Sequence, residues 1–152
     1  MPITHQIDHL QKLVIARAAG VITDEDVFGY HFAAWSRPDV VGYKELVDMS
    51  AVTEIRVPSI DRVRELARVG TAMDLAVQPA RLAVVAVDDA TFGLARMFKT
   101  YRSIESQGQK EVGIFREITE ALAFLGVDTL PEKDEVQEGD YSRENAPEMD
   151  NA

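Results

Sequence analysis

The stretch RLAVVAVDDATFGLARMFKTYRSIE, residues 81–105, decides the fold. Its first seven residues form a continuous run rich in β-forming residues, which is typical of a strand covered on both faces of a sheet. The residues from 88 onward switch to a helical period. Five large side chains of this second part are predicted to face inward: Leu94, Met97, Phe98, Tyr101 and Ile104. A buried strand followed directly by an amphipathic helix predicts an α/β protein.

The same alternation of strands and helices continues on both sides of this unit. Strands are predicted for residues 3–8, 12–20, 43–49, 81–87 and 110–117. Helices are predicted for residues 23–36, 59–77, 88–105 and 118–126. The first two strands can pair as a hairpin, and right-handed crossovers make the later pairs parallel. We therefore expect a mixed, mostly parallel five-stranded sheet with an N-terminal β-hairpin and four helices, in the order β-β-α-β-α-β-α-β-α.

The pattern divides the chain into a body and a tail. Residues 1–127 are predicted to form a single α/β domain. Residues 128–152 hold nine acidic side chains against two basic ones, so that most of the net charge of −10 lies there. This segment has no hydrophobic period and cannot bury enough apolar surface to offset the entropy of ordering. We expect an acidic, flexible tail, with docking of its first part on a neighbour as the alternative.

Composition excludes several classes of protein. The body is nearly balanced in charge and offers no dense basic face, so nucleic acid is not an expected partner. No apolar run approaches the roughly 18 residues of a membrane span. The first ten residues lack the pattern of a signal peptide, and a cytoplasmic location is the simplest interpretation. The chain has no cysteine, which excludes disulfides, thiolate metal sites and cysteine nucleophiles.

Element order and three stretches carry a resemblance to a known family. The stretches are LVDMSAVTEI (46–55), DDATFGLARMF (88–98) and VGIFREITEALAFLG (112–126). Over roughly residues 3–126 the chain resembles the SpoIIAA-like branch of the STAS fold, the fold of sulfate transporter and anti-sigma factor antagonist domains. The SpoIIAA-like group is also compared with CRAL-TRIO-type lipid-binding domains. The resemblance implies the fold, and none of its motifs is catalytic.

In anti-anti-sigma proteins of this fold, the loop after the third strand carries an Asp-Ser-Ser-Gly type motif whose serine is phosphorylated. Here Arg56, Val57, Pro58 and Ser59 stand at that place, and only a shifted alignment brings Ser59 near the serine position. One interpretation is that Ser59 caps the next helix or lies in its first turn. The other is a phosphoswitch at Ser59, or second at Ser50, because a phosphoserine at a helix N-terminus is electrostatically favourable.

Polar residues at the carboxyl ends of the strands are candidates for ligand binding. Ligands of parallel sheets gather at this edge. Three loops are expected to meet there: residues 20–23, 50–58 and 88–91. A pocket at that edge would use Asp48, Ser50 and Asp88, with Arg96 one or two turns along the following helix. The alternative for Asp88 is a helix cap.

Further charged residues and histidines have structural interpretations beside functional ones. Arg96, Lys99 and Arg102 recur every three residues, either as a solvated face or as a docking strip for an anionic headgroup or an acidic partner. His5 and His9 lie about 13 Å apart on an extended strand, too far to share a metal ion. His31 is predicted to be a partly buried structural histidine. We predict no metal site and no cofactor.

The first predicted helix is unusually aromatic. Thr23 with Asp26 three residues on indicates its start. Four aromatic side chains follow within three turns: Phe28, Tyr30, Phe32 and Trp35. Neighbouring residues on a helix are turned about 100° apart, so a single sheet cannot cover all of these rings. They can serve the core, a homodimer interface or the wall of an apolar pocket. We expect at least one exposed ring and a homodimer.

No signature of an enzyme is present. The chain lacks a Gly-rich phosphate loop, a G-x-S-x-G elbow and a His-Glu-x-x-His helix. The predicted function is therefore a non-catalytic module of STAS-like fold that binds an anionic or apolar small molecule, lipids included, or a protein. The alternative is an anti-anti-sigma-type regulatory phosphoswitch.

Overall fold

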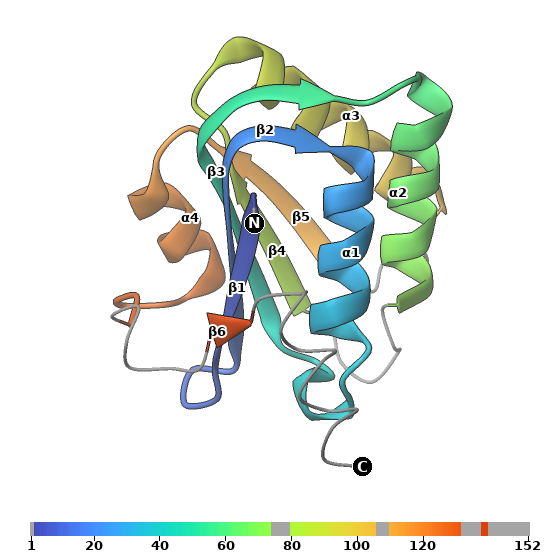
Figure 1. Cartoon of the computed structure of the whole chain (residues 1–152). Coiled ribbons are helices and arrows are strands. Elements are labelled where there is room, and N and C mark those ends of the chain that lie inside the picture. Colours follow the sequence, from blue (N-terminus) through green and yellow to red (C-terminus); the bar gives the residue numbers. More distant parts are fainter. Residues whose placement is uncertain (1, 74–79, 106–109, 132–137, 140–152) are drawn as a thin grey trace.

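A computed structural model describes residues 2–73, 80–105, 110–131 and 138–139 of the chain (Figure 1). The strands are β1 (Ile3–Asp8), β2 (Leu13–Thr23), β3 (Lys44–Arg56), β4 (Ala80–Val85), β5 (Lys110–Phe115) and β6 (Glu138–Gly139). The helices are α1 (Asp24–Trp35), α2 (Ile60–Met73), α3 (Asp89–Glu105) and α4 (Ile118–Leu125), with a 3-10 turn η1 (Pro38–Val40) after α1. The predicted order of five strands and four helices is confirmed.

The sheet runs in the order β5-β4-β3-β2-β1-β6. The β1–β2 hairpin is antiparallel, and β2, β3, β4 and β5 pair in parallel. The mixed, mostly parallel sheet predicted from the sequence is therefore confirmed. The two-residue strand β6 adds to the outer edge of β1, also antiparallel.

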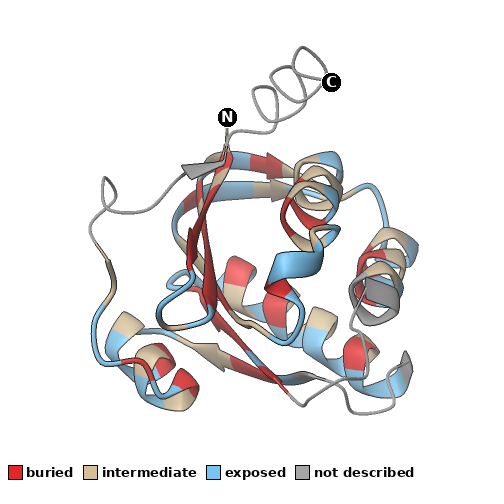
Figure 2. Ribbon diagram, turned by 90° about the horizontal axis from the view of Figure 1, so that it is seen from below, coloured by how far each residue is buried: buried red, intermediate tan, exposed pale blue. Residues whose placement is uncertain are grey.

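The helices cover the two faces of the sheet unequally. Figure 1 shows α1, α2 and α3 on one face and α4 on the other. Figure 2, a view from below, shows buried residues along the sheet and on the inward sides of these helices. On the α4 face, Leu13, Ile15 and Leu46 of the sheet pack against Ala121 and Leu125. On the opposite face the strands pack against α1 and α3 in two clusters. The three-helix side is thus the thicker layer.

Strands β2 and β3 extend well beyond their neighbours. Strand β4 pairs with β3 only over Glu45–Asp48, whereas β2 and β3 stay paired as far as Thr23 and Arg56. The pairing of β2 with β3 shifts register twice along this extension, between Arg17 and Ala19 and between Gly20 and Val21. In Figure 1 the extended pair bends over the top of the three-helix side and leads into α1 and α2. The loops expected at residues 20–23 and 50–56 are therefore strand, because each segment hydrogen-bonds to the other.

Helix α1 begins as its sequence indicates. Asp26 donates its backbone N–H to the Thr23 hydroxyl at 3.2 Å, and the Asp26 carboxylate accepts the Thr23 backbone N–H at 2.9 Å. This reciprocal capping box satisfies two backbone donors that the helix leaves open. Asp24 in the same turn forms an ion pair with Arg62 of α2, with 2.6 Å between Oδ2 and Nε. The starts of α1 and α2 are thereby joined under the extended β2–β3 pair.

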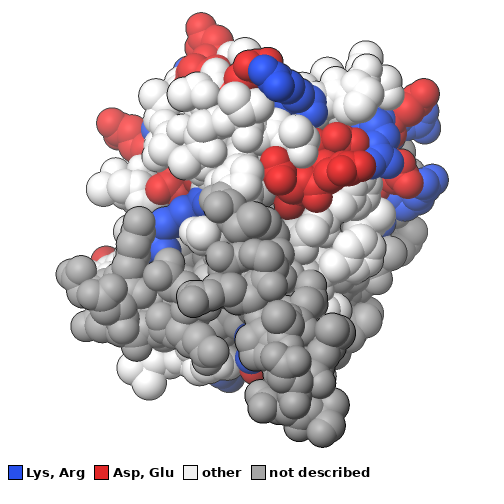
Figure 3. Space-filling model, in the orientation of Figure 1, with Lys and Arg blue, Asp and Glu red and all other residues white. Residues whose placement is uncertain are grey.

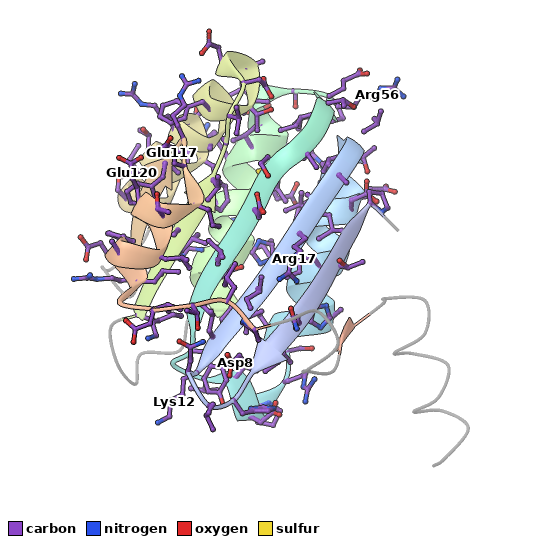
Figure 4. All side chains as sticks on the ribbon, turned by 90° about the vertical axis from the view of Figure 1, so that its left-hand side faces the viewer. Asp8, Lys12, Arg17, Arg56, Glu117 and Glu120 are labelled. Atoms are coloured by element: carbon purple, nitrogen blue, oxygen red, sulfur yellow. The ribbon has the colours of Figure 1, made fainter. Side chains whose placement is uncertain are left out.

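The chain after α4 crosses back over the sheet. Gly126 ends α4 with a left-handed backbone (φ 71°), and Val127 then donates its N–H to Leu122. We name residues 127–131 the strap. Figure 4 shows the strap running across the α4 face toward β1. Val127 and Leu130 pack with the core on that face, and Thr129 accepts a 2.9 Å hydrogen bond from the Gln11 side chain.

The predicted tail is described only in part. Glu138 and Gly139 form β6, which pairs with Gln6 and His5 of the same chain. Residues 132–137 and 140–152 lie outside the described residues, and the flexibility of the tail stays a prediction. Its first part contacts the body of its own chain.

Candidate functional site

A cavity of about 120 Å³ lies between the sheet and helices α1, α2 and α3. We name it the sheet–helix cavity. Short side chains stand where the layers face each other: Ala16 and Ala18 on β2, and Ala95 on α3. Each is buried, and each leaves room that a larger side chain would fill. The cavity exists because these alanines come together from two layers.

The walls of the cavity are apolar almost throughout. Val47, Met49, Leu82 and Val84 line it from the sheet, and Leu94 and Phe98 line it from α3. The extended β2–β3 pair contributes Ile22 and Ile55, and α2 contributes Val63 and Leu66. The bend of β2 and β3 over the helices thus closes one end of the cavity.

A buried carboxylate stands in the wall of this apolar space. Glu45 of β3 lines the cavity and is only 2% exposed. The Tyr30 hydroxyl of α1 donates to Glu45 Oε2 at 2.5 Å, and Trp35 Nε1 lies 3.1 Å from the same oxygen. Burying a charge is costly unless hydrogen bonds compensate it, and two donors meet this oxygen.

Two histidine rings lie beside the Tyr30 ring. His5 of β1 lies edge-on to the Tyr30 ring at 6.2 Å between centroids, and His31 lies at 5.5 Å. Burial, with the positive charge of Arg37 adding to it, lowers the pKa of His5 to about 4. His5 is therefore neutral near pH 7. His31 also lines the cavity.

His5 and His9 point to different surroundings. His9 is exposed in the β1–β2 turn and bonds the Tyr43 hydroxyl at 2.8 Å, whereas His5 is buried on the cavity face. Within the described ranges, no group of three or more histidine, aspartate or glutamate side chains is placed to hold a metal ion.

The polar residues predicted to bind a ligand lie outside the cavity. Asp88 accepts the backbone N–H of Thr91 at 3.0 Å and its hydroxyl at 2.7 Å, and these bonds lower the pKa of Asp88. It thus has the contacts of a helix cap. Asp48 accepts the N–H and the hydroxyl of Ser50. Arg96 is exposed on α3. A ligand role for these four residues stays a prediction.

The predicted phosphorylation sites are both exposed. Ser59 precedes α2 directly, and its carbonyl oxygen accepts the N–H of Arg62 at 3.1 Å. Ser50 lies in the extended part of β3, where its hydroxyl donates to Asp48. Nothing in these contacts assigns a phosphate to either serine, and the switch stays a prediction.

The four aromatic rings of α1 lie in different surroundings. Tyr30 is buried, whereas Phe32 is 57% exposed. Phe28 is half-buried, with the Arg62 guanidinium 4.6 Å from its ring centre. Trp35 is half-buried and reaches Glu45 through its indole N–H. One ring therefore faces outward, as the helix geometry requires.

The basic residues of α3 do not form one exposed strip. Arg96 and Lys99 are exposed, but Arg102 is only 3% exposed and lies near the Phe98 ring. Residues three apart on a helix are turned by about 300°, so a row at this spacing drifts around the helix. The prediction that all three form one solvated face is wrong for Arg102. The prediction that Ile104 faces inward is also wrong, because its side chain is 70% exposed. Figure 3 shows Lys and Arg scattered among Asp and Glu on the described part of the displayed face.

The arrangement of the layers is similar to that of a solved structure. No family model matches the chain, and no curated protein matches it. The solved structure is that of an uncharacterised protein of the DUF3478 family with a SpoIIAA-like fold, from Shewanella loihica PV-4. The TM-score is 0.52 at 17% identity, over 81% of this chain and 93% of that one. This chain has a SpoIIAA-like fold.

The comparison confirms the resemblance predicted from the sequence, and at this identity it shows the fold alone. Strand β3 lies between β4 and β2 in the sheet, so neighbouring strands flank Glu45 on both sides. None of the described helices combines the length and the apolar character needed to cross a membrane.

Sequence reasoning missed Glu45 and the cavity. Glu45 is a carboxylate inside the predicted strand at residues 43–49, next to the apolar Leu46 and Val47. A charged residue at a position that the pattern places in a central strand is unusual. That signal could have singled out Glu45, but not its partners.

Proposed function

We propose that this chain is a non-catalytic binding module that takes up an apolar small molecule in the sheet–helix cavity. The single observation that carries the proposal is the cavity itself, about 120 Å³ with an almost wholly apolar lining. Binding sites for small molecules are concave and mostly apolar, with a few polar groups that fix orientation. Glu45, Tyr30 and His31 are the polar groups at one end of this site.

The cavity favours the apolar class over the anionic class of ligands expected from the sequence. Asp88 bonds to Thr91 at the start of α3, and Asp48 and Ser50 bond to each other within β3. These are local contacts between near neighbours in the sequence, and they need no ligand. Protein interiors are normally close-packed, so a space of this size is a feature that requires an explanation.

The experiment that tests the proposal uses toluene as the probe. Toluene is titrated into the protein while backbone amide shifts are recorded by NMR, and native mass spectrometry of gently purified protein looks for a copurified molecule. We expect saturable shifts at residues of β2, β3 and α3. Ala95→Leu fills the cavity from α3 and should abolish these shifts. Ala90→Leu makes the same change at an exposed position of the same helix and should preserve them.

The proposal fails if toluene leaves the cavity residues unshifted in the parent protein. It also fails if Ala95→Leu and Ala90→Leu respond alike, because the probe would then bind elsewhere.

We further propose that the chain forms a homodimer, with α1 at the contact. Phe32 supports this proposal, because it is a large apolar side chain exposed on α1. Aromatic side chains are enriched in protein interfaces, and two-fold partners are the commonest among oligomers.

A phosphoswitch at Ser59 is the second candidate function. The observation that favours it is the exposure of Ser59 directly before the first turn of α2. A phosphate there would meet the positive end of the helix dipole. Phosphosites are mapped by mass spectrometry after incubation with cell extract and ATP. Labelling of Ser59 supports the switch, and absence of label at both Ser59 and Ser50 contradicts it.

A further inference from the structure

The sheet–helix cavity lies between two hydrophobic clusters of the three-helix side. Ile22 belongs to the first cluster, together with residues of β1 and α1. Ala95 of α3 belongs to the second, together with residues of β4 and β5. Val47 and Met49 of β3 pack against both clusters, line the cavity and are only half-buried. A ligand in the cavity would therefore contact both clusters at once.

Two isoleucines close one end of the cavity. Ile22 of β2 and Ile55 of β3 are neighbours across the extended strand pair, and both line the cavity. Ile22 is fully buried, and Ile55 packs against the cluster that contains it. In Figure 1 this part of the strand pair bends over the helices. Because β-branched side chains are stiff at χ1, the two isoleucines form a wall that adapts little to a longer ligand.

The opposite end is closed by a contact between α1 and the sheet. Glu45 pairs with Leu82 of β4 and precedes Val47 along β3, so it lies away from Ile55. The Tyr30 hydroxyl of α1 contacts Glu45 at 2.5 Å, and both residues line the cavity. The cavity is therefore bounded at both ends along the direction of the strands.

The volume restricts the ligand to a small molecule. An engineered protein cavity of about 150 Å³ binds a single benzene molecule. The sheet–helix cavity, at about 120 Å³, is of the same order and slightly smaller. A long acyl chain needs several times the volume of one ring. With both ends closed, such a chain cannot extend further along the strands.

The lining favours a ligand made mainly of carbon and hydrogen. Its walls are apolar almost throughout. Two threonines also line it, but their hydroxyls bond at the starts of helices. Thr23 donates to Asp26 at 3.0 Å, and Thr91 donates to Asp88 at 2.7 Å. These hydroxyls serve the helix starts, so they give a polar ligand little advantage.

We propose that the sheet–helix cavity takes compact, hydrocarbon-like molecules of about one ring, and that the pair Ile22 and Ile55 limits the length of the ligand. This inference rests on the proposed function, and it names the class of ligand for that site. Long-chain fatty acids and other extended lipids fall outside this class.

The test compares toluene with n-butylbenzene, which has the same ring and three further CH₂ groups. Both are titrated into the unaltered protein under NMR observation. In an open apolar groove each added CH₂ group would strengthen binding about fourfold. In a cavity closed at its ends, the longer chain must displace a wall. We expect n-butylbenzene to bind at least about tenfold more weakly than toluene. Equal or tighter binding of n-butylbenzene would overturn the inference.

Two variants assign the length limit to the isoleucine pair. Ile55→Ala removes most of one closing side chain, so the affinity for n-butylbenzene should rise to within a few-fold of that for toluene or above it. Ile60→Ala makes the same change at an exposed position that does not line the cavity, and should keep the preference of the parent. A preference for toluene that persists unchanged in Ile55→Ala contradicts the role of the pair. Ile55→Val removes one methyl group and should shift the preference in the same direction, which keeps the test available where Ile55→Ala does not fold.

The two levels of the proposal fail in different ways. If toluene and n-butylbenzene both leave the cavity residues unshifted, the proposed binding function fails. If toluene binds and n-butylbenzene binds at least as well, the cavity is a binding site and only the limit on ligand length fails. The comparison in the unaltered protein separates these outcomes without any variant.

Discussion

Tyr30 of α1 donates a hydrogen bond to Glu45 of β3, with 2.5 Å between the hydroxyl oxygen and Oε2. Both residues are buried, and they join the aromatic helix to the centre of the sheet. The bond therefore has two consequences. It compensates a buried carboxylate, and it holds α1 against the polar end of the sheet–helix cavity.

Tyr30→Phe removes the hydroxyl and leaves the carboxylate with fewer donors. We expect the free energy of unfolding to fall by about 2 kcal/mol, since a buried acceptor that loses its partner retains the cost of its desolvation. Tyr43→Phe is the matched control, because its hydroxyl bonds the exposed His9. Urea denaturation of both variants gives the comparison. Equal losses in the two variants would show that the buried bond has no special weight.

His5 predicts how stability depends on pH. Its pKa in the folded protein, about 4, lies below the ordinary value of 6.5, so the unfolded chain binds more protons. The stabilisation is complete above pH 6.5 and is lost as the pH falls toward 4. Between pH 7.5 and pH 5.0 the loss from His5 alone is about 2 kcal/mol.

Denaturation of the parent and of His5→Gln at these two pH values checks this. The variant cannot protonate at this position and should lose about 2 kcal/mol less than the parent over the interval. His9→Gln removes an exposed histidine instead and controls for the loss of one histidine. An unchanged pH dependence in His5→Gln would contradict the assignment.

The strap predicts where the chain can be shortened. A chain that ends at Pro131 lacks β6 but keeps the strap, and we expect its melting midpoint to fall by less than about 5 °C. A chain that ends at Gly126 also lacks Val127 and Leu130, which pack in the core of the α4 face. Each buried side chain of this size contributes roughly 1.5–3 kcal/mol, so the second cut should lower the midpoint by more than about 5 °C. Thermal melts of the two shortened chains compare these effects. Equal melting midpoints would show that the strap does not stabilise the fold.

Most of the architecture could be predicted because its signals are local. The run at 81–87 indicated a covered strand, Thr23 and Asp26 indicated the start of α1, and Gly126 indicated the end of α4. Each of these features depends on residues that lie close together in the sequence. Patterns of that range can be followed along a single sequence.

The sheet–helix cavity could not be predicted, because it depends on contacts between distant residues. Ala16, Ala18 and Ala95 leave space only when β2 and α3 face each other. Glu45 is compensated by Tyr30, fifteen residues away on another element. The extension of β3 to Arg56 likewise depends on pairing with β2. No periodic pattern of neighbouring residues indicates any of these three contacts.

The homodimer proposal predicts an effect of Phe32 on association. At micromolar concentration the parent should sediment as a dimer, and Phe32→Ser should shift it toward the monomer, because a buried aromatic contact would be lost. Ile104→Ser, at another exposed apolar residue, should leave the dimer intact. Analytical ultracentrifugation gives the masses. A parent protein that is monomeric at all concentrations contradicts the proposal.

We expect replacement of glycine by alanine to have opposite effects on the free energy of unfolding at Gly113 and at Gly93. A Cβ on Gly113 of β5 would lie 2.7 Å from the Phe115 ring and 3.2 Å from the Phe124 ring. These rings pack together at 5.3 Å between centroids, so one must shift to admit a methyl group. We expect Gly113→Ala to lower the free energy of unfolding by about 1–3 kcal/mol, the usual cost of overpacking.

Gly93 provides the contrast on α3. A Cβ there meets no atom within 4 Å. Alanine also favours the helical backbone by up to about 1 kcal/mol over glycine, so Gly93→Ala should raise the free energy of unfolding. Urea denaturation of the two variants beside the parent measures both changes. If Gly113→Ala were as stable as Gly93→Ala, the contact between Gly113 and the two phenylalanine rings would not be tight, and α4 would pack on β5 less closely than described.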